Sequence, residues 1–270
     1  MSTEIISSTA NPKIKALKKL DKASERKAQN KILIEGLRET VLAARAGFQI
    51  HSLFVCAEYL KTDGEYRFEE LKQVQHTVYI TKQVYESLAY REGTEGVIAI
   101  AEPRHLSLNE LQLPVNCLVL VIEAVEKPGN LGAMLRTADA AGVDAVIICD
   151  AKTDLYNPNV IRSSVGTVFT NRVVAAETEE VMRFLASKQI TTYAAELNAT
   201  QPHYAADYTK PSAFVVGTEA TGLSPVWLTA ANQKIKIPMM GKIDSLNVSV
   251  SAAVLLYEAV RQRNFSAQNI

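Results

Sequence analysis

The chain carries, near its C-terminal end, the stretch Ile237-Pro-Met-Met-Gly-Lys-Ile-Asp-Ser-Leu-Asn-Val-Ser-Val-Ser-Ala-Ala-Val-Leu-Leu-Tyr-Glu258. Pro238 and Gly241 interrupt regular structure, so the first part of this stretch predicts a loop. Ser245 and Asn247 then precede a helix, at a place where such side chains accept backbone N–H bonds. The small residues that follow allow another segment of backbone to approach closely. Taken alone, the stretch is explained by a packed helix with an ordinary cap.

A second stretch, Glu126-Lys-Pro-Gly-Asn-Leu-Gly-Ala-Met-Leu-Arg136, joins an apolar strand at 118–122 to a helix expected from about 131 to 141. Ligands bind at such junctions in open α/β sheets. Asn130 is expected just before the helix and Arg136 within it. An arginine among apolar residues is either paired with an acid at the helix edge or presented to an anion such as an RNA phosphate.

The third stretch is Phe214-Val-Val-Gly-Thr-Glu-Ala-Thr-Gly-Leu-Ser-Pro225. Glycines at the end of a buried strand let a ligand reach backbone N–H and C=O groups. A plain strand, turn and helix would explain Ser224 as a cap and Pro225 as the first helical residue. That simpler interpretation leaves Gly217 and Glu219 unexplained.

The pattern along the chain predicts an α/β protein. Residues 116–270 alternate near-continuous apolar strands with helices, which indicates a mostly parallel sheet covered on both faces. Residues 31–101 predict a small α/β domain, and the two prolines within 102–115 mark a linker. Residues 1–30 hold seven Lys and Arg against three acids, seven minus three or +4, and predict a basic leader with one helix at 12–29. Such a leader is a modest indication of nucleic acid, although a solvated helix face explains it too.

Composition narrows the class of protein. Apolar residues make up 47% and charged residues 21% of the chain, as in globular proteins, and no apolar run is long enough to span a membrane. The three cysteines, Cys56, Cys117 and Cys149, lie in or beside strand-like runs, so we expect free thiols and a reducing, cytoplasmic location. The four histidines are scattered without ligand spacing, and no metal site is expected.

Together, the three stretches resemble the motifs of the SpoU (TrmH) family of RNA ribose 2′-O-methyltransferases, within the SPOUT class. The resemblance covers about residues 116–264, and residues 31–101 are similar to the small substrate-binding domain that often precedes it. It implies a SPOUT domain with a deep trefoil knot, S-adenosyl-L-methionine (SAM) as cofactor, and a homodimer.

The same resemblance implies the roles of individual residues. The cofactor would be held largely by backbone around Leu197, Gly217, Ile237, Met239 and Leu246. The candidate catalytic residues are Arg136, Asn130, Glu219, Ser245 and Asn247. Arg136 would stand near the ribose hydroxyl, as a base or as an electrostatic anchor; since a guanidinium resists deprotonation, we favour the anchor. Asn130, Ser245 and Asn247 would position the RNA and the loop, and Glu219 would support its motif or pair with Arg136.

The expected function is therefore SAM-dependent methylation of a ribose 2′-hydroxyl in large-subunit ribosomal RNA. Two alternatives keep the fold: a tRNA ribose methyltransferase, and a catalytically silent RNA-binding factor of ribosome assembly. A nucleotide-binding oxidoreductase is disfavoured because the G-x-G-x-x-G fingerprint is absent.

Overall fold

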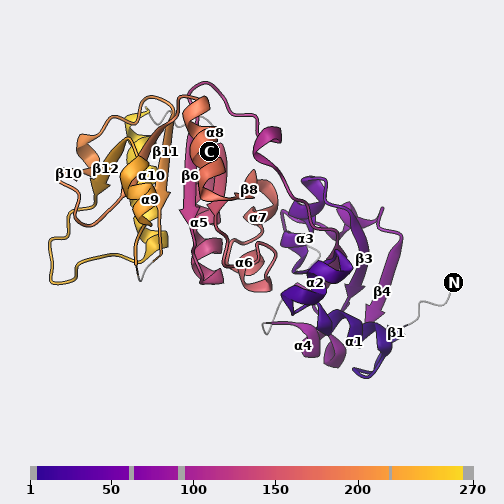
Figure 1. Ribbon diagram of the computed structural model, residues 1–270. Coiled ribbons are helices and arrows are strands. Elements are labelled where there is room, and N and C mark those ends of the chain that lie inside the picture. Colours follow the sequence, from indigo (N-terminus) through magenta and orange to yellow (C-terminus); the bar gives the residue numbers. More distant parts are fainter. Residues whose placement is uncertain (1–4, 61–63, 91–94, 219–220, 264–270) are drawn as a thin grey trace. The chain divides into compact units, whose positions relative to one another are not determined.

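The structure is a computed structural model of the 270-residue chain and describes residues 5–60, 64–90, 95–218 and 221–263 (Figure 1). The chain forms two compact units. Unit 1 comprises Met1–Arg104 with Asp154–Thr170, and unit 2 comprises His105–Thr153 with Asn171–Ile270. Residues 154–170 therefore belong with the first unit, although they lie in the second half of the sequence.

Unit 1 is built around a five-stranded mixed sheet with the strand order β1-β4-β3-β5-β2. Strand β4 pairs in parallel with β1 and β3, whereas β5 pairs antiparallel with β3 and β2. Four of the strands lie within residues 31–101, where a small α/β domain was expected, and β1 lies before it. The strands are β1 (Ile5–Ile6), β2 (Ile32–Glu35), β3 (Ile50–Val55), β4 (His76–Ile80) and β5 (Val97–Ala101).

The helices of unit 1 pack on this sheet and on one another, with α3 against β2 and β5 and α1 against α4. The segment at 154–170 supplies two of them: α6 contacts β2, and α7 contacts α3. Unit 1 also contains a short 3-10 turn, η1 (Phe68–Leu71). The helices are α1 (Pro12–Lys19), α2 (Ala23–Gln29), α3 (Leu37–Arg45), α4 (Lys82–Leu88), α6 (Pro158–Ser163) and α7 (Thr167–Thr170).

The prediction of one helix over 12–29 is wrong, because the chain forms α1 and α2 with a break between them. The start is as expected: Pro12 is the first helical residue, and the Asn11 side chain accepts the N–H of Lys13 at 2.9 Å. At the break, the Arg26 guanidinium donates to the backbone carbonyls of Leu20 (2.6 Å) and Asp21 (2.8 Å). A side chain thus satisfies carbonyls that a continuous helix would have paired with backbone amides.

Unit 2 contains a seven-stranded sheet with the order β10-β12-β9-β11-β6-β7-β8. All of its described strand pairs are parallel, which confirms the predicted sheet. Every residue of β6, β7 and β11 is buried, as expected for strands covered on both faces. The strands are β6 (Leu118–Glu123), β7 (Ala145–Cys149), β8 (Val173–Ala176), β9 (Thr191–Ala195), β10 (Gln201–Pro202), β11 (Ser212–Val216) and β12 (Gln233–Lys236).

Four helices accompany the sheet of unit 2. Helices α8 and α9 bury Val181 and Trp227 in a core with Val119 and Val121 of β6. Helices α5 and α10 pack against each other, and α10 also contacts β11. The helices are α5 (Pro128–Ala140), α8 (Thr178–Ser187), α9 (Pro225–Ala230) and α10 (Val248–Gln262), with short 3-10 turns η2 (Leu108–Glu110) and η3 (His203–Ala205).

The three cysteines are buried and free, as expected. Burial raises the pKa of the Cys149 thiol to about 12, so this thiol stays protonated at neutral pH. Within the described residues, no helix is long and apolar enough to cross a membrane.

Candidate functional site

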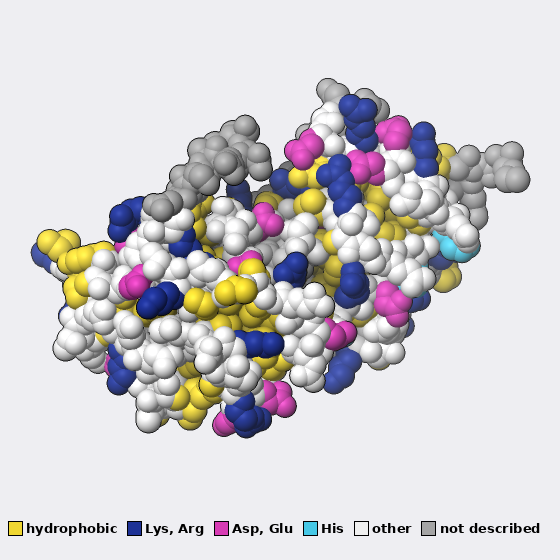
Figure 2. Space-filling view, turned by 90° about the horizontal axis from the view of Figure 1, so that it is seen from above, with side chains coloured by type: hydrophobic (Ala, Val, Ile, Leu, Met, Phe, Trp, Pro, Cys, Tyr) yellow, Lys and Arg dark blue, Asp and Glu magenta, His cyan; other side chains and the backbone are white. Residues whose placement is uncertain are grey.

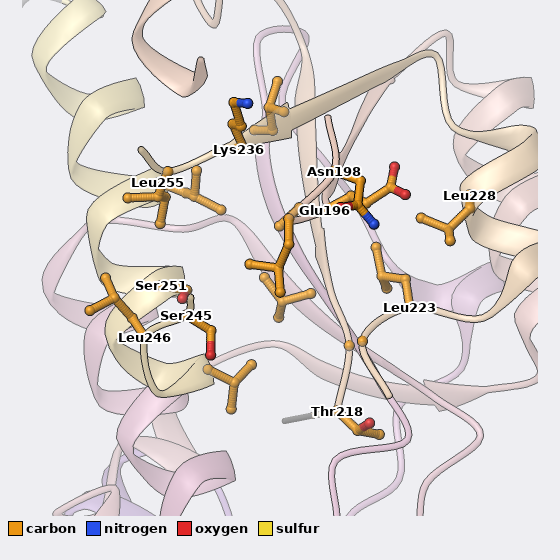
Figure 3. Close-up of a pocket in the computed structure, with 18 of the residues that line it drawn as sticks. Glu196, Asn198, Thr218, Leu223, Leu228, Lys236, Ser245, Leu246, Ser251 and Leu255 are labelled. Carbon is orange, nitrogen blue, oxygen red and sulfur yellow. The ribbon is translucent and has the colours of Figure 1, made fainter. Parts of the chain in front are cut away.

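A cavity of about 350 Å³ opens in unit 2 at the carboxyl ends of β9, β11 and β12 (Figure 3). The carboxyl ends of parallel strands meet at one edge of a sheet, which is where ligands bind in open α/β folds. Residues just after each of these strands line the cavity, and the loop before α10 and the start of α10 complete it. In Figure 3, Ser245, Leu246 and Ser251 lie on the side of α10, and Leu223 and Leu228 lie opposite them.

The five residues expected around a cofactor all line this cavity: Leu197, Gly217, Ile237, Met239 and Leu246. They come from the ends of β9, β11 and β12 and from the loop before α10, so the fold gathers positions that are far apart in sequence. Most of them offer only backbone and apolar side-chain surface. The cavity therefore suits a ligand that is held by shape and by main-chain groups.

The turn at Gly217 depends on the absence of a side chain. A Cβ there would lie 2.2 Å from the backbone oxygen of Gly222 and 2.6 Å from the nitrogen of Leu223. The turn is closed by two backbone hydrogen bonds of 3.0 Å between Thr218 and Gly222, and Gly222 has a φ of +68°. The close approach explains the glycine at position 217, and the positive φ explains the glycine at position 222.

The first and second stretches of sequence meet beside the cavity. The Asn247 side-chain amide donates to the Asn130 side-chain oxygen at 3.2 Å, although 117 residues separate them. Asn247 is also the N-cap of α10, as predicted, because its side-chain oxygen accepts the backbone N–H of Ser249 at 3.0 Å. Since Ser245 and Leu246 line the cavity, three consecutive residues connect the cavity wall to α5.

Asn130 lies inside the first turn of α5 rather than before it, because the helix begins at Pro128. Proline suits a first helical position, where a backbone N–H would have no helical partner. The residue is half-buried, so its side chain has restricted access to solvent.

Arg136 lies on α5, is exposed, and is not among the residues that line the cavity. Within the described part of the chain its guanidinium has neither an ion pair nor a hydrogen bond, so an acid partner at the helix edge is not observed there. Ser245 is exposed, and its hydroxyl donates to the Asp244 carboxylate at 3.0 Å. Glu219 lies outside the described residues.

Several polar residues of the cavity wall were not predicted from the sequence. Glu196 and Asn198 follow β9 and flank Leu197, and Thr218 and Thr221 lie in the turn after β11. The signal that was available for Glu196 and Asn198 is their place directly after a strand of a parallel sheet. Among the described residues, no group of three or more His, Cys, Asp or Glu could hold a metal ion.

The family comparisons cover both units. Residues 117–257 match the SpoU rRNA Methylase family, and residues 11–99 match the MRM3-like substrate binding domain. The chain is 30% identical over 254 residues to the 23S rRNA (guanosine(2553)-2′-O)-methyltransferase RlmP of Bacillus subtilis (strain 168), which covers 93% of this chain and 97% of the relative.

Solved structures agree with this assignment. A crystal structure of an RNA 2′-O ribose methyltransferase is 40% identical, with a TM-score of 0.86 over 96% of this chain and 99% of that one. The SpoU methyltransferase AviRb from Streptomyces viridochromogenes, in complex with the cofactor AdoMet, is 26% identical, with a TM-score of 0.84 over 96% of this chain and 100% of that one. With a family match over more than half of its residues and a full-length relative at 30% identity, the chain belongs to the SpoU rRNA methylase family.

Proposed function

We propose that the protein is a SAM-dependent methyltransferase that acts on a ribose 2′-hydroxyl of 23S ribosomal RNA. The observation that carries the proposal is the cavity at the carboxyl edge of β9, β11 and β12, where residues from separate parts of the chain converge. Family membership supports the reaction type. The 23S rRNA named for the relative that matches nearly the whole chain supports the substrate.

The residues of the cavity fit SAM. The volume of the cavity, about 350 Å³, lies within the range of small-molecule sites, roughly 300–1,000 Å³. We propose that Leu197, Gly217, Ile237, Met239 and Leu246 hold the cofactor, mainly through backbone groups. When bound, SAM supplies an electrophilic methyl group on its sulfonium.

Polar and charged residues at the cavity and beside it would prepare the RNA. A ribose hydroxyl is a weak nucleophile and loses its proton as it attacks. We propose that Arg136 anchors a phosphate and the ribose, since its guanidinium keeps its proton and has no partner in the described part of the chain. Asn130, Ser245 and Asn247 would position the loop and the RNA beside the cavity. Glu219 would support the turn after β11 or pair with Arg136.

The protein is further proposed to be a cytoplasmic homodimer whose SPOUT domain contains a trefoil knot. Exposed apolar side chains on α10 (Val250 and Tyr257) and in the loop before it (Met240 and Ile243) support an interface there, with Met240 exposed to 96%. We also propose that the chain is divided into four segments: a leader at 1–30, a small domain at 31–101, a linker at 102–115 and the methyltransferase domain at 116–270. Multi-angle light scattering tests the dimer: a monomer at micromolar concentration would contradict it.

Calorimetric titration with SAM tests the cofactor site, and the chain offers a matched pair of glycine variants. Gly217→Ala forces a Cβ into the backbone of Gly222, so we expect SAM affinity to fall by at least about tenfold. Gly129→Ala is the control, because nothing lies within 4 Å of a Cβ placed there and alanine favours a helix. Equal affinities for the two variants would contradict the assignment of the cavity.

The substrate is tested with labelled SAM and total RNA from cells that lack the protein. We expect label in 23S rRNA and a reverse-transcription stop at one nucleotide at low dNTP concentration. Label confined to tRNA would contradict the ribosomal substrate. SAM binding without transfer to any RNA would instead indicate a silent RNA-binding factor.

The surface charge bears on how the RNA is bound. The chain has no net charge, and on the face in Figure 2 the Lys and Arg side chains lie among Asp and Glu rather than in one basic field. Affinity for RNA then depends on local groups whose charge is not compensated.

A further inference from the structure

Tyr90 of unit 1 presents an exposed aromatic ring that is held in place from several sides. The side chain is 58% exposed and follows the end of α4. The backbone N–H of Tyr90 donates to the Glu35 carboxylate at 2.9 Å, and its hydroxyl accepts from the Asn159 side-chain amide at 3.2 Å. An exposed ring with this many restraints loses little conformational freedom when a ligand binds to it.

Arg162 of α6 lies over this ring, with its guanidinium carbon 4.8 Å from the ring centroid. The guanidinium donates to the Asn159 side-chain oxygen at 2.7 Å. Asn159 therefore bridges the arginine and the tyrosine and fixes both. No carboxylate of the described residues forms an ion pair with Arg162, so its charge and most of its five N–H donors remain available.

The other cation–aromatic pairs that the described residues form are different. In two of them a carboxylate compensates the cation: Glu70 for Arg45 over Tyr66, and Glu86 for Lys82 over Tyr59. In the remaining pair, Arg104 over Phe48, the aromatic ring is buried. Within the described part of the chain, Tyr90 and Arg162 thus combine an exposed ring with an uncompensated cation.

Hydrogen bonds of two side chains, Asn157 and Asp154, hold the start of α6 in place. Asn157 caps this helix by accepting the Asn159 backbone N–H at 2.9 Å. Asp154, just before it, accepts from the Nε of the buried Arg26 at 2.7 Å. The packing of unit 1 therefore sets the position of Arg162 over the ring.

We propose that Tyr90, Arg162 and Asn159 form a platform on which an unpaired base of the substrate RNA stacks, with Arg162 contacting the adjacent phosphate. The inference rests on RNA being the substrate, as proposed above. Aromatic rings and guanidinium planes are the groups that stack on bases of single-stranded RNA, whereas bases within a duplex are covered by their neighbours. The uncompensated cation favours a polyanion over an apolar protein surface as the partner.

The test uses the full-length protein and a single-stranded RNA oligonucleotide that contains 2-aminopurine, whose fluorescence falls when it stacks. We expect Tyr90→Ala to weaken binding by about 5- to 150-fold and to abolish the quenching. Tyr90→Phe keeps the ring and should retain most of the quenching. Arg162→Gln should reduce the slope of log affinity against log salt by about 0.7, the loss of one phosphate contact on a single strand.

Two matched controls separate this platform from general effects. Tyr204 of unit 2 is 59% exposed and packs beside His203, and no arginine of the described residues stacks on it, so Tyr204→Ala should leave binding unchanged. Lys82→Gln removes an exposed cation that already has a carboxylate partner, and the salt slope should stay the same. Circular dichroism of each variant checks that it is folded.

Three results would overturn the proposal. One is a wild-type protein that binds duplex RNA as tightly as the single strand, or that binds the single strand without quenching. Another is equal losses in Tyr90→Ala and Tyr204→Ala. The third is dissociation of a dimer by Tyr90→Ala in sedimentation experiments, which would assign the ring to a protein interface. Each can occur while methylation of ribosomal RNA persists, so failure of the platform is distinguishable from failure of the proposed function.

Discussion

Arg26 on α2 is 4% exposed, whereas Arg136 on α5 is exposed to solvent. The Arg26 guanidinium donates to the Asp154 carboxylate and to the backbone carbonyls of Leu20 and Asp21. In the described part of the chain, Arg136 has no such partner. The two arginines belong to different units, and each helix sets a different environment for the same functional group.

This difference separates an arginine that holds the fold from one that remains available to a ligand. A buried guanidinium is tolerated only when its N–H groups and charge are satisfied, so the partners of Arg26 are a condition for its burial. An exposed guanidinium needs no such partners and keeps its donors for an anion. The sequence places Arg26 among the seven basic residues of the leader, and the structure shows that its side chain is buried.

The largest effect is expected on breaking the buried pair. Asp154→Ala leaves the Arg26 charge buried without a carboxylate, and removal of one partner of a buried pair costs about 3–5 kcal/mol. We expect a large fall in the unfolding midpoint, measured by circular dichroism. Lys27→Ala, at an exposed neighbour on the same helix, is the control and should change the midpoint little. A midpoint equal to that of the control would mean that unit 1 does not need the pair.

The second prediction concerns the exposed arginine. Arg136→Ala should leave the unfolding midpoint and the SAM affinity unchanged, since Arg136 has no partner in the described part of the chain and does not line the cavity. It should lower kcat for RNA methylation by about 100- to 1,000-fold, as for loss of one electrostatic contact in a transition state. Arg183→Ala, at an exposed position of α8, is the matched control. Wild-type kcat in Arg136→Ala would remove the role proposed for this residue.

Much of the fold was predictable because its signals are local. Strands such as β6 and β7 are continuous apolar runs, and Pro12 and Asn11 mark the start of α1. The break after α1 was not predictable, because it depends on Arg26, whose partner Asp154 is 128 residues away in sequence. The return of residues 154–170 to unit 1 likewise has no periodic signal.

In the candidate site, too, some residues were predictable from the neighbouring sequence and others depend on distant parts of the chain. Gly217 was predictable from a glycine at the end of a buried strand, and Asn247 from its place before a helix. For Leu197 the local signal is only its place after a strand, and the resemblance to a family indicated its role. The contact of Asn247 with Asn130 joins residues 117 positions apart, so it could be seen only in the folded chain.

The third prediction concerns Asn247, which both caps α10 and contacts Asn130. Asn247→Ala removes the N-cap of α10 and the contact with Asn130, and loss of such a cap costs about 1 kcal/mol. Asn247→Asp keeps the oxygen that accepts from Ser249 but lacks the amide that donates to Asn130. We therefore expect the Asp variant to retain the unfolding midpoint and to methylate RNA more slowly. An Asp variant with wild-type kcat would assign Asn247 to the fold alone.

The smallest effect is expected from an arginine that is exposed but paired. Arg261 of α10 donates to the Glu258 carboxylate through two bonds of 2.8 Å, and this contact is the main cause that lowers the pKa of Glu258 from 4.5 to about 2. Because the pKa is lower in the folded state, the pair stabilises the fold above about pH 4.5 and loses that contribution as pH falls toward 2.

Thermal unfolding between these pH values measures this contribution. The midpoint of the wild type should exceed that of Glu258→Gln at neutral pH, and the difference should shrink steadily as the solution is acidified. Arg261→Ala should reproduce most of this change, because it removes the main cause of the shift. Parallel curves for the wild type and both variants would show that an exposed pair of this kind leaves stability unaffected. Arg261 would then resemble Arg136 in its small contribution to the fold, and burial rather than pairing would distinguish Arg26 from both.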